Sequence, residues 1–137
     1  MEIDILNKKL SEVDIRGLNP LVLAFIGDAV YEVFVRTNLV ENNKDMSAHK
    51  LHVKAVSFVK AKAQSEIIKG IMDSLTDEEI VIFKRGRNSK SGTVPKNADV
   101  QDYRMATGFE ALIGYLYLME RKDRLNEIMN FIFKHSN

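Results

Sequence analysis

Residues 21–31, Leu-Val-Leu-Ala-Phe-Ile-Gly-Asp-Ala-Val-Tyr, form an apolar run of helical length that contains one acidic residue, Asp28, between two small ones. A second run, residues 106–119, holds Glu110 next to Ala111. A carboxylate among apolar side chains loses its hydration, which costs on the order of several kcal/mol if nothing compensates. Protonation, a basic partner or a bound cation can compensate, and two acids that converge on one point favour the cation. Two separate, hydrogen-bonded structural acids are the alternative.

Glycines accompany both acids. Gly27 precedes Asp28, and Gly108 and Gly114 flank Glu110. Because glycine is unfavourable inside a helix, we expect these positions to let two helices approach closely enough for their carboxylates to share a cation. Tight helix packing without a ligand explains the glycines equally well.

The remaining sequence predicts helices almost throughout. Asn19-Pro20 supplies a cap and a first-turn proline for a helix that runs to about Asn38. Thr76 and Glu79 match a capping box, and the helix that they start reaches about Arg85. Further helices are expected over about 99–119 and 123–134. One more helix, over about 45–73, is predicted by an apolar stripe with a spacing of three or four residues: Leu51, Ala55, Phe58, Val59, Ala63, Ile67 and Ile71.

Residues 86–97 break the helical pattern. They contain two glycines and a proline without apolar periodicity, which predicts a solvent-facing loop. From Lys84 to Arg104 there are six basic and two acidic residues, although the whole chain carries a net charge of only +1. Such a segment suits the phosphates of RNA, while a solvated surface of mixed charge is the alternative.

Length and composition limit the remaining possibilities. A chain of 137 residues fits one all-α domain of five to seven helices, with its core at about residues 18–134. The absence of cysteine excludes thiolate metal sites and cysteine nucleophiles. No signal or membrane segment is recognisable, so a cytoplasmic location is expected.

Several segments resemble the ribonuclease III family. Residues 23–32, Leu-Ala-Phe-Ile-Gly-Asp-Ala-Val-Tyr-Glu, resemble the signature helix of its catalytic domain. Residues 109–118 are similar to its second metal-binding helix, and Asp45-Met46-Ser47 to the start of another family segment. Within this family, the chain resembles most closely the Mini-ribonuclease III branch, which lacks a double-stranded-RNA-binding domain. The resemblance lies in its short length, the Asn19-Pro20-Leu21 motif and the motifs at 85–88 and 95–97.

The resemblance implies a homodimeric, all-helical endonuclease that cuts both strands of double-stranded RNA and leaves 5′-phosphates. It implies Mg²⁺ as cofactor, with Mn²⁺ as a substitute, and precursor 23S ribosomal RNA as substrate, with a ribosomal protein as a further candidate partner. Asp28 and Glu110 become the catalytic metal ligands, and apolar residues of the helix at 21–34 the dimer interface. The implied RNA-binding residues are Arg85, Arg87, Asn88, Lys90, Lys96 and Arg104.

The sequence departs from the wider family at two positions. Ala24 and Thr107 stand where that family has further carboxylates, so we expect water and RNA phosphate oxygens to complete the coordination of the ion. One alternative is therefore a catalytically impaired dimer that binds double-stranded RNA or assists ribosome assembly. A nucleotide pyrophosphohydrolase would require paired Glu-x-x-Glu motifs on buried faces, which this chain lacks. A structural helical dimer without a ligand is the remaining alternative.

Overall fold

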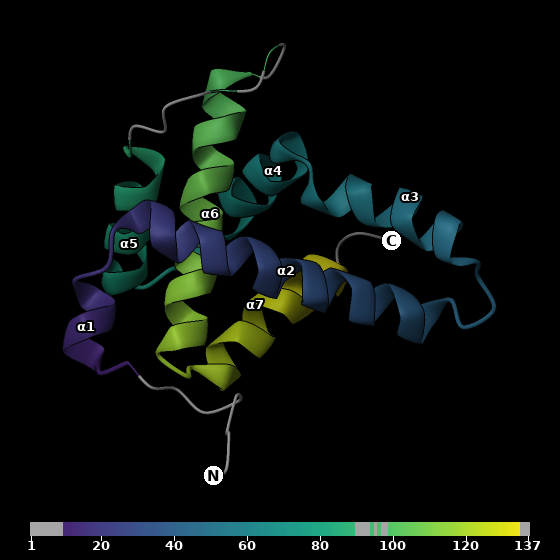
Figure 1. The fold of residues 1–137 in the computed structure, drawn as a ribbon, viewed down its shortest axis with the longest axis horizontal. Coiled ribbons are helices and arrows are strands. Elements are labelled where there is room, and N and C mark those ends of the chain that lie inside the picture. Colours follow the sequence, from purple (N-terminus) through teal and green to yellow (C-terminus); the bar gives the residue numbers. More distant parts are fainter. Residues whose placement is uncertain (1–9, 90–93, 95, 97–98, 135–137) are drawn as a thin grey trace, which may run out of the picture.

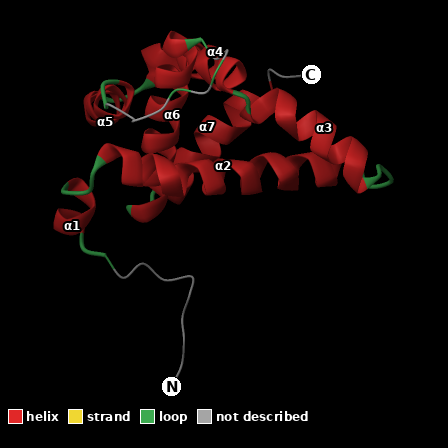
Figure 2. Ribbon diagram, turned by 45° about the horizontal axis from the view of Figure 1, so that its top comes forward, coloured by secondary structure: helices red, strands yellow, loops and turns green. Residues whose placement is uncertain are grey.

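The computed structural model describes residues 10–89, 94, 96 and 99–134, and in these ranges every regular element is a helix (Figures 1 and 2). The predicted all-α class is confirmed. None of the described helices combines the length and apolar character that a membrane crossing requires. The elements are α1 (Glu12–Arg16), α2 (Pro20–Asn42), α3 (Ala48–Val59), α4 (Ala61–Ile71), the 3₁₀ turn η1 (Met72–Ser74), α5 (Asp77–Arg87), α6 (Val100–Leu118) and α7 (Lys122–Lys134).

Local sequence signals set the first residues of these helices. At the start of α2, the Asn19 side chain accepts a hydrogen bond of 2.8 Å from the Leu21 backbone N–H. Pro20 fits the first helical position because it has no backbone N–H that would need a partner there. The capping box of α5 is present as predicted, because Thr76 and Glu79 each accept a hydrogen bond from the other's backbone. α2 continues one turn beyond its predicted end, to Asn42.

Two boundary predictions were wrong. The single helix expected over 45–73 is broken at Lys60, whose backbone is extended (φ −64°, ψ 152°), into α3 and α4. The buried face changes phase there: Ala55 is buried in α3, but Gln64 and Ile68 are buried in α4, so the stripe does not continue at helical spacing. In addition, Gly86 and Arg87 belong to α5 rather than to the predicted loop, much of which lies outside the described residues.

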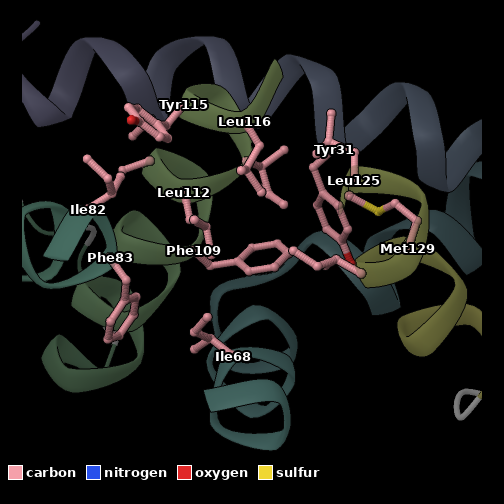
Figure 3. Close-up of a cluster of buried hydrophobic side chains, with 14 of the residues drawn as sticks. Tyr31, Ile68, Ile82, Phe83, Phe109, Leu112, Tyr115, Leu116, Leu125 and Met129 are labelled. Carbon is pink, nitrogen blue, oxygen red and sulfur yellow. The ribbon is translucent and has the colours of Figure 1, made fainter. Parts of the chain in front are cut away.

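Helix α6 forms the centre of the molecule. It packs against α2, α4, α5 and α7, and α2 crosses in front of it in Figure 1. Phe109, Leu112 and Leu116 of α6 are fully buried in the cluster that Figure 3 shows. The Tyr31 ring of α2 meets Phe109 edge to face, with 5.0 Å between ring centroids. The middle of α6, where most side chains are buried, is therefore held in place from several sides.

Two acids of α5 join this helix to the C-terminal part of the chain. Burial opposes the charge of Glu79, but hydrogen bonds from Arg124, at 2.8 Å to each carboxylate oxygen, and from Thr76 outweigh it and hold the pKa of Glu79 below its ordinary value. Glu78 is paired with Arg121 and accepts a 2.7 Å hydrogen bond from Tyr115. These carboxylates have basic partners and stabilise the fold.

Candidate active site

Helices α2 and α6 cross in backbone contact at two glycines. A Cβ atom on Gly27 would lie 1.7 Å from the Glu110 carbonyl oxygen, and one on Gly114 would lie 2.0 Å from the Leu23 carbonyl oxygen. No side chain fits in either place, so the predicted role of these glycines in close helix approach is confirmed. For Gly108 that prediction was wrong, because Gly108 faces Phe83 of α5 instead of α2.

This crossing brings the two predicted acids together. Gly27 contacts the backbone of Glu110, and Asp28 is the residue after Gly27. The side chains of Asp28 and Glu110 are therefore neighbours at the crossing, and their carboxyl groups are hydrogen-bonded. Burial, then the hydrogen bond and negative charge of Asp28, raise the pKa of Glu110 to about 8. Glu110 is therefore mostly protonated at neutral pH, which is the condition of two carboxyls that share one site without a cation.

The two acids differ in burial. Glu110 is half-buried, whereas Asp28 is exposed, which corrects the expectation that both are enclosed by apolar side chains. The reason lies in the neighbours of Asp28: Ala29 is also exposed, and the Phe25 side chain is 77% exposed. The pair therefore combines a shielded carboxyl with one that solvent and a large ligand can reach.

A third polar side chain, Gln64 of α4, also contacts this site. Gln64 is 2% exposed, and its Nε2 donates a 2.8 Å hydrogen bond to the Val59 carbonyl oxygen. Gln64 also partly opposes the rise in the pKa of Glu110. The Gln64 Oε1 atom is buried without a hydrogen-bond partner among the described residues. The sequence prediction missed Gln64, although it lies four residues before Ile68 and seven before Ile71, a spacing that places it on the same helical face.

The donor set fits a hard divalent cation with few protein ligands. Within the described ranges no group of three or more acidic, histidine or cysteine side chains could hold a metal ion. Ala24 contributes no oxygen, and the Thr107 hydroxyl donates a 3.0 Å hydrogen bond to the Tyr103 carbonyl oxygen of its own helix. Mg²⁺ commonly binds through one or two carboxylates and completes its shell with water and phosphate oxygens, so Asp28 and Glu110 suffice as protein ligands.

Two of the predicted RNA-binding residues, Arg85 and Arg87, lie in the last turn of α5. A Cβ atom on Gly86 of α5 would lie 2.8 Å from the Ala111 Cβ, so the basic end of α5 packs beside the α6 turn that carries Glu110. Arg85 is exposed and donates a 3.3 Å hydrogen bond to the Leu18 carbonyl oxygen. The Arg87 guanidinium lies 5.6 Å from the centre of the Phe83 ring.

The other predicted contacts are only partly described. Asn88 caps α5 and accepts a 3.1 Å hydrogen bond from Arg87. Lys96 and Arg104 are exposed, Arg104 in the second turn of α6. Lys90 lies outside the described residues. The described basic side chains therefore lie at the C-terminal end of α5, at Lys96 and in the second turn of α6.

Comparison with known proteins gives a consistent result. Residues 21–121 match the family model "Ribonuclease III domain". The Mini-ribonuclease 3 of Clostridium tetani is 56% identical over 127 residues, which cover 93% of this chain and 84% of that protein. The Mini-ribonuclease 3 of a Thermoanaerobacter species is 52% identical over 120 residues, with coverage of 88% and 84%. A crystal structure of a protein from Fusobacterium nucleatum superimposes with a TM-score of 0.81 at 35% identity and covers 90% of this chain and 98% of that one.

Proposed function

Because the chain belongs to the ribonuclease III family and is an endoribonuclease, we propose that it hydrolyses double-stranded RNA with Mg²⁺ bound at Asp28 and Glu110. The observation that carries this proposal is the meeting of the two carboxyl groups at the α2–α6 crossing, with Glu110 destabilised as an anion in the absence of a cation. Mn²⁺ is expected to substitute, because carboxylate ligands accept both ions.

The residues of the chain have distinct tasks in such a reaction. Asp28 and Glu110 would hold the cation. A bound cation would polarise the phosphate, lower the pKa of a bound water molecule and stabilise the leaving oxygen. Glu110 must be ionised to serve as a ligand, so it gives up its proton when the cation binds. The nearby basic side chains, Arg85 among them, would hold the sugar-phosphate backbone of the duplex against the site.

Incubation of the purified protein with a long RNA duplex tests this function. We expect fragments only when Mg²⁺ or Mn²⁺ is present, with 5′-phosphate ends and with single-stranded RNA cut far more slowly. Duplex binding without cleavage at any concentration of either ion would favour the impaired RNA-binding dimer. Release of pyrophosphate from nucleoside triphosphates would favour a pyrophosphohydrolase.

The proposed RNA contact depends on charge, and its removal should change the salt dependence of binding. Replacing Arg85, Lys96 and Arg104 with alanine should weaken duplex binding and lower the slope of log affinity against log salt by about one per lost phosphate contact. Fluorescence anisotropy with a labelled duplex and no metal measures this slope. Lys122→Ala is the control and should leave the slope unchanged, because Lys122 begins α7, beyond the C-terminal end of α6, whereas Arg104 lies near its start. An unaltered slope in the triple variant would remove these residues from the RNA interface.

We also infer that the protein acts as a homodimer through the outer face of α2. This face carries apolar side chains that stay exposed in the single chain, Phe25 at 77% and Val33 at 62% among them, and Val22 and Val40 continue it at helical spacing. A two-fold dimer would bring two acid pairs to one duplex, as cutting both strands requires. Because Asp28 lies on the exposed side of the same helix, the partner chain would border the site.

Phe25→Asp should convert the dimer into a monomer. A charge at the centre of an apolar interface is left unpaired and desolvated, which opposes association. Val13→Asp is the matched control, since Val13 has the same 77% exposure but lies on α1. Light scattering coupled to size exclusion should give a monomer mass for the first variant and a dimer mass for the second. A monomeric wild-type protein, or a dimeric Phe25→Asp variant, contradicts this interface.

In the cell, we infer that the substrate is precursor 23S ribosomal RNA in the cytoplasm, with a ribosomal protein as a partner on that RNA. The support is the similarity to Mini-ribonuclease 3 proteins over most of the chain. Mapping of the 23S termini in cells without the enzyme should reveal extended precursor ends that the wild-type gene removes and an Asp28→Asn gene does not. Mature ends in the deletion strain would remove this substrate assignment.

A further inference from the structure

The Arg87 guanidinium, at the C-terminal end of α5, lies over the ring of Phe83, with 5.6 Å between its central carbon and the ring centre. We propose that Phe83 is a positioning residue: its ring holds the Arg87 guanidinium in one orientation, so that the two terminal nitrogens bind a phosphate of the RNA duplex. This inference rests on the proposed function. It adds that the geometry of Arg87, and not only its positive charge, determines the affinity for RNA.

The Phe83 ring is itself fixed by the core. Phe83 is fully buried and belongs to the cluster in Figure 3. Its ring packs on α6 where Gly108 has no side chain, because a Cβ atom on Gly108 would lie 2.7 Å from two atoms of the ring. Gly86, the neighbour of Arg87, packs on the same turn, since its added Cβ would lie 3.0 Å from the Gly108 Cα. The support for Arg87 is therefore tied to the α6 turn that carries Glu110.

A second contact restricts the Arg87 side chain. Its Nε donates a 3.1 Å hydrogen bond to the Asn88 Oδ1 atom, and the side chain is half-buried. A guanidinium has five N–H donors, and four of them are on the two terminal nitrogens. These four can bind two oxygens of one phosphate together, and the contact with the Phe83 ring needs none of them. The ring and a phosphate can therefore contact the same guanidinium.

The charge of Arg87 distinguishes it from a similar pair elsewhere in the chain. Arg121 lies over the Tyr115 ring at 5.5 Å, but an ion pair with Glu78 balances its charge. Among the residues that the structure describes, no carboxylate forms an ion pair with Arg87. A restrained arginine without an acidic partner suits an anion, and the proposed substrate supplies phosphates.

Restraint of Arg87 matters because binding otherwise has to order a long side chain. Each flexible side chain that becomes fixed in a complex loses conformational entropy, which weakens the complex. Arg87 has lost much of this freedom already in the folded protein, through Phe83 and Asn88. Lysine at this position would keep the charge but lose the planar group with its paired donors. The inference therefore predicts that even the conservative change to lysine weakens RNA binding.

Three substitutions separate geometry from charge. Arg87→Lys keeps the charge but not the planar group, Phe83→Leu keeps the arginine but removes the ring, and Arg87→Ala removes the charge. Arg121→Lys is the matched control, because it makes the same change in the other arginine that lies over a ring. Duplex affinity is measured without metal by fluorescence anisotropy at several salt concentrations. The temperature is one at which circular dichroism shows the variants folded.

We expect Arg87→Lys to bind the duplex about 3–30-fold more weakly, the range that loss of a cation–π contact gives. Its slope of log affinity against log salt should equal that of the wild type, because the charge is kept. Phe83→Leu should show the same loss and the same slope, and the double variant should lose little more than either single one. Arg87→Ala should lower the slope by about one. Arg121→Lys should bind like the wild type.

Wild-type duplex affinity in Arg87→Lys would overturn the inference, because charge alone would then account for Arg87. This result does not depend on the folding of Phe83→Leu. Wild-type affinity in a folded Phe83→Leu protein, or an equal loss in Arg121→Lys, would overturn the role of Phe83 as well.

Failure of the proposed function has a different outcome. A wild-type protein that binds no duplex would contradict the proposed substrate, and the inference with it. A wild-type protein that binds the duplex but does not cut it with Mg²⁺ or Mn²⁺ would contradict only the proposed reaction. Because the binding assay contains no metal, its result for Arg87 and Phe83 is independent of the cation at Asp28 and Glu110.

Discussion

Asp28→Asn will slow cleavage of duplex RNA by about 10³-fold or more, because a cation that loses one of two carboxylate ligands loses several kcal/mol of transition-state stabilisation. The fold and the metal-free RNA affinity should be retained, because Asp28 is exposed and lies outside the core. Glu110→Gln should have a similar effect on cleavage. It should not lower thermal stability, since it replaces a half-buried acid with a neutral group of the same shape.

Glu32→Gln is the matched control for Asp28→Asn. Glu32 lies one turn further along α2 and pairs with Arg36 at 3.0 Å on the surface, where an ion pair contributes little. Initial rates over a range of Mg²⁺ concentrations should be near wild type for Glu32→Gln and near background for Asp28→Asn. Undiminished cutting by Asp28→Asn would exclude this carboxylate as a ligand.

Gly27→Ala will destabilise the protein by more than about 3 kcal/mol, which corresponds to a fall in the melting temperature of roughly 10 °C or more. The added methyl group would lie 1.7 Å from the Glu110 carbonyl oxygen, and backbone on both sides leaves no flexible side chain to move aside. Relief requires α2 and α6 to separate, which also separates Asp28 from Glu110. Cleavage should therefore be lost even at temperatures at which the variant is folded.

Gly70→Ala shows whether this effect belongs to the crossing or to any helical glycine. Gly70 is exposed on α4, and its added Cβ would lie 4.0 Å from the Phe131 ring, at an ordinary van der Waals distance. This substitution should stabilise the protein by about 0.5–1 kcal/mol, because alanine is the better helix former. Thermal denaturation monitored by circular dichroism compares the two. A Gly27→Ala protein as stable as Gly70→Ala would mean that the helices do not meet as described.

The sequence contained enough information to pair Asp28 with Glu110, because each is the one acid in an apolar run and stands beside a small residue. The same reasoning could not tell that Asp28 is exposed. α2 is apolar on nearly every side, with Leu23 buried and Phe25 exposed, and the side that other helices cover is decided by the crossing at Gly27. Local patterns fix the helix, whereas contacts distant in the sequence fix its buried face.

The α3–α4 junction shows the same limit. A regular apolar stripe predicted one helix through residue 60, but α4 packs on α6 with a shifted phase that buries Gln64 and Ser65. The residue at the break is a lysine, Lys60, rather than a glycine or proline that would signal it, and no side chain caps the start of α4. The predicted stripe therefore ran through Ala63 and Ile67, whereas Gln64 and Ile68 are the residues buried in α4.

Joint binding of one cation by Asp28 and Glu110 is tested most directly by calorimetric titration of Mn²⁺ into the RNA-free wild-type protein, Asp28→Asn, Glu110→Gln and the double variant. The expected result is about one ion per wild-type chain, bound more tightly as the pH rises from 6 to 8 and Glu110 (pKa about 8) loses its proton. Each single variant should lose as much affinity as the double variant, because the two carboxylates act on one ion. Wild-type affinity in either single variant, or losses that simply add, would show that the acids do not share a cation.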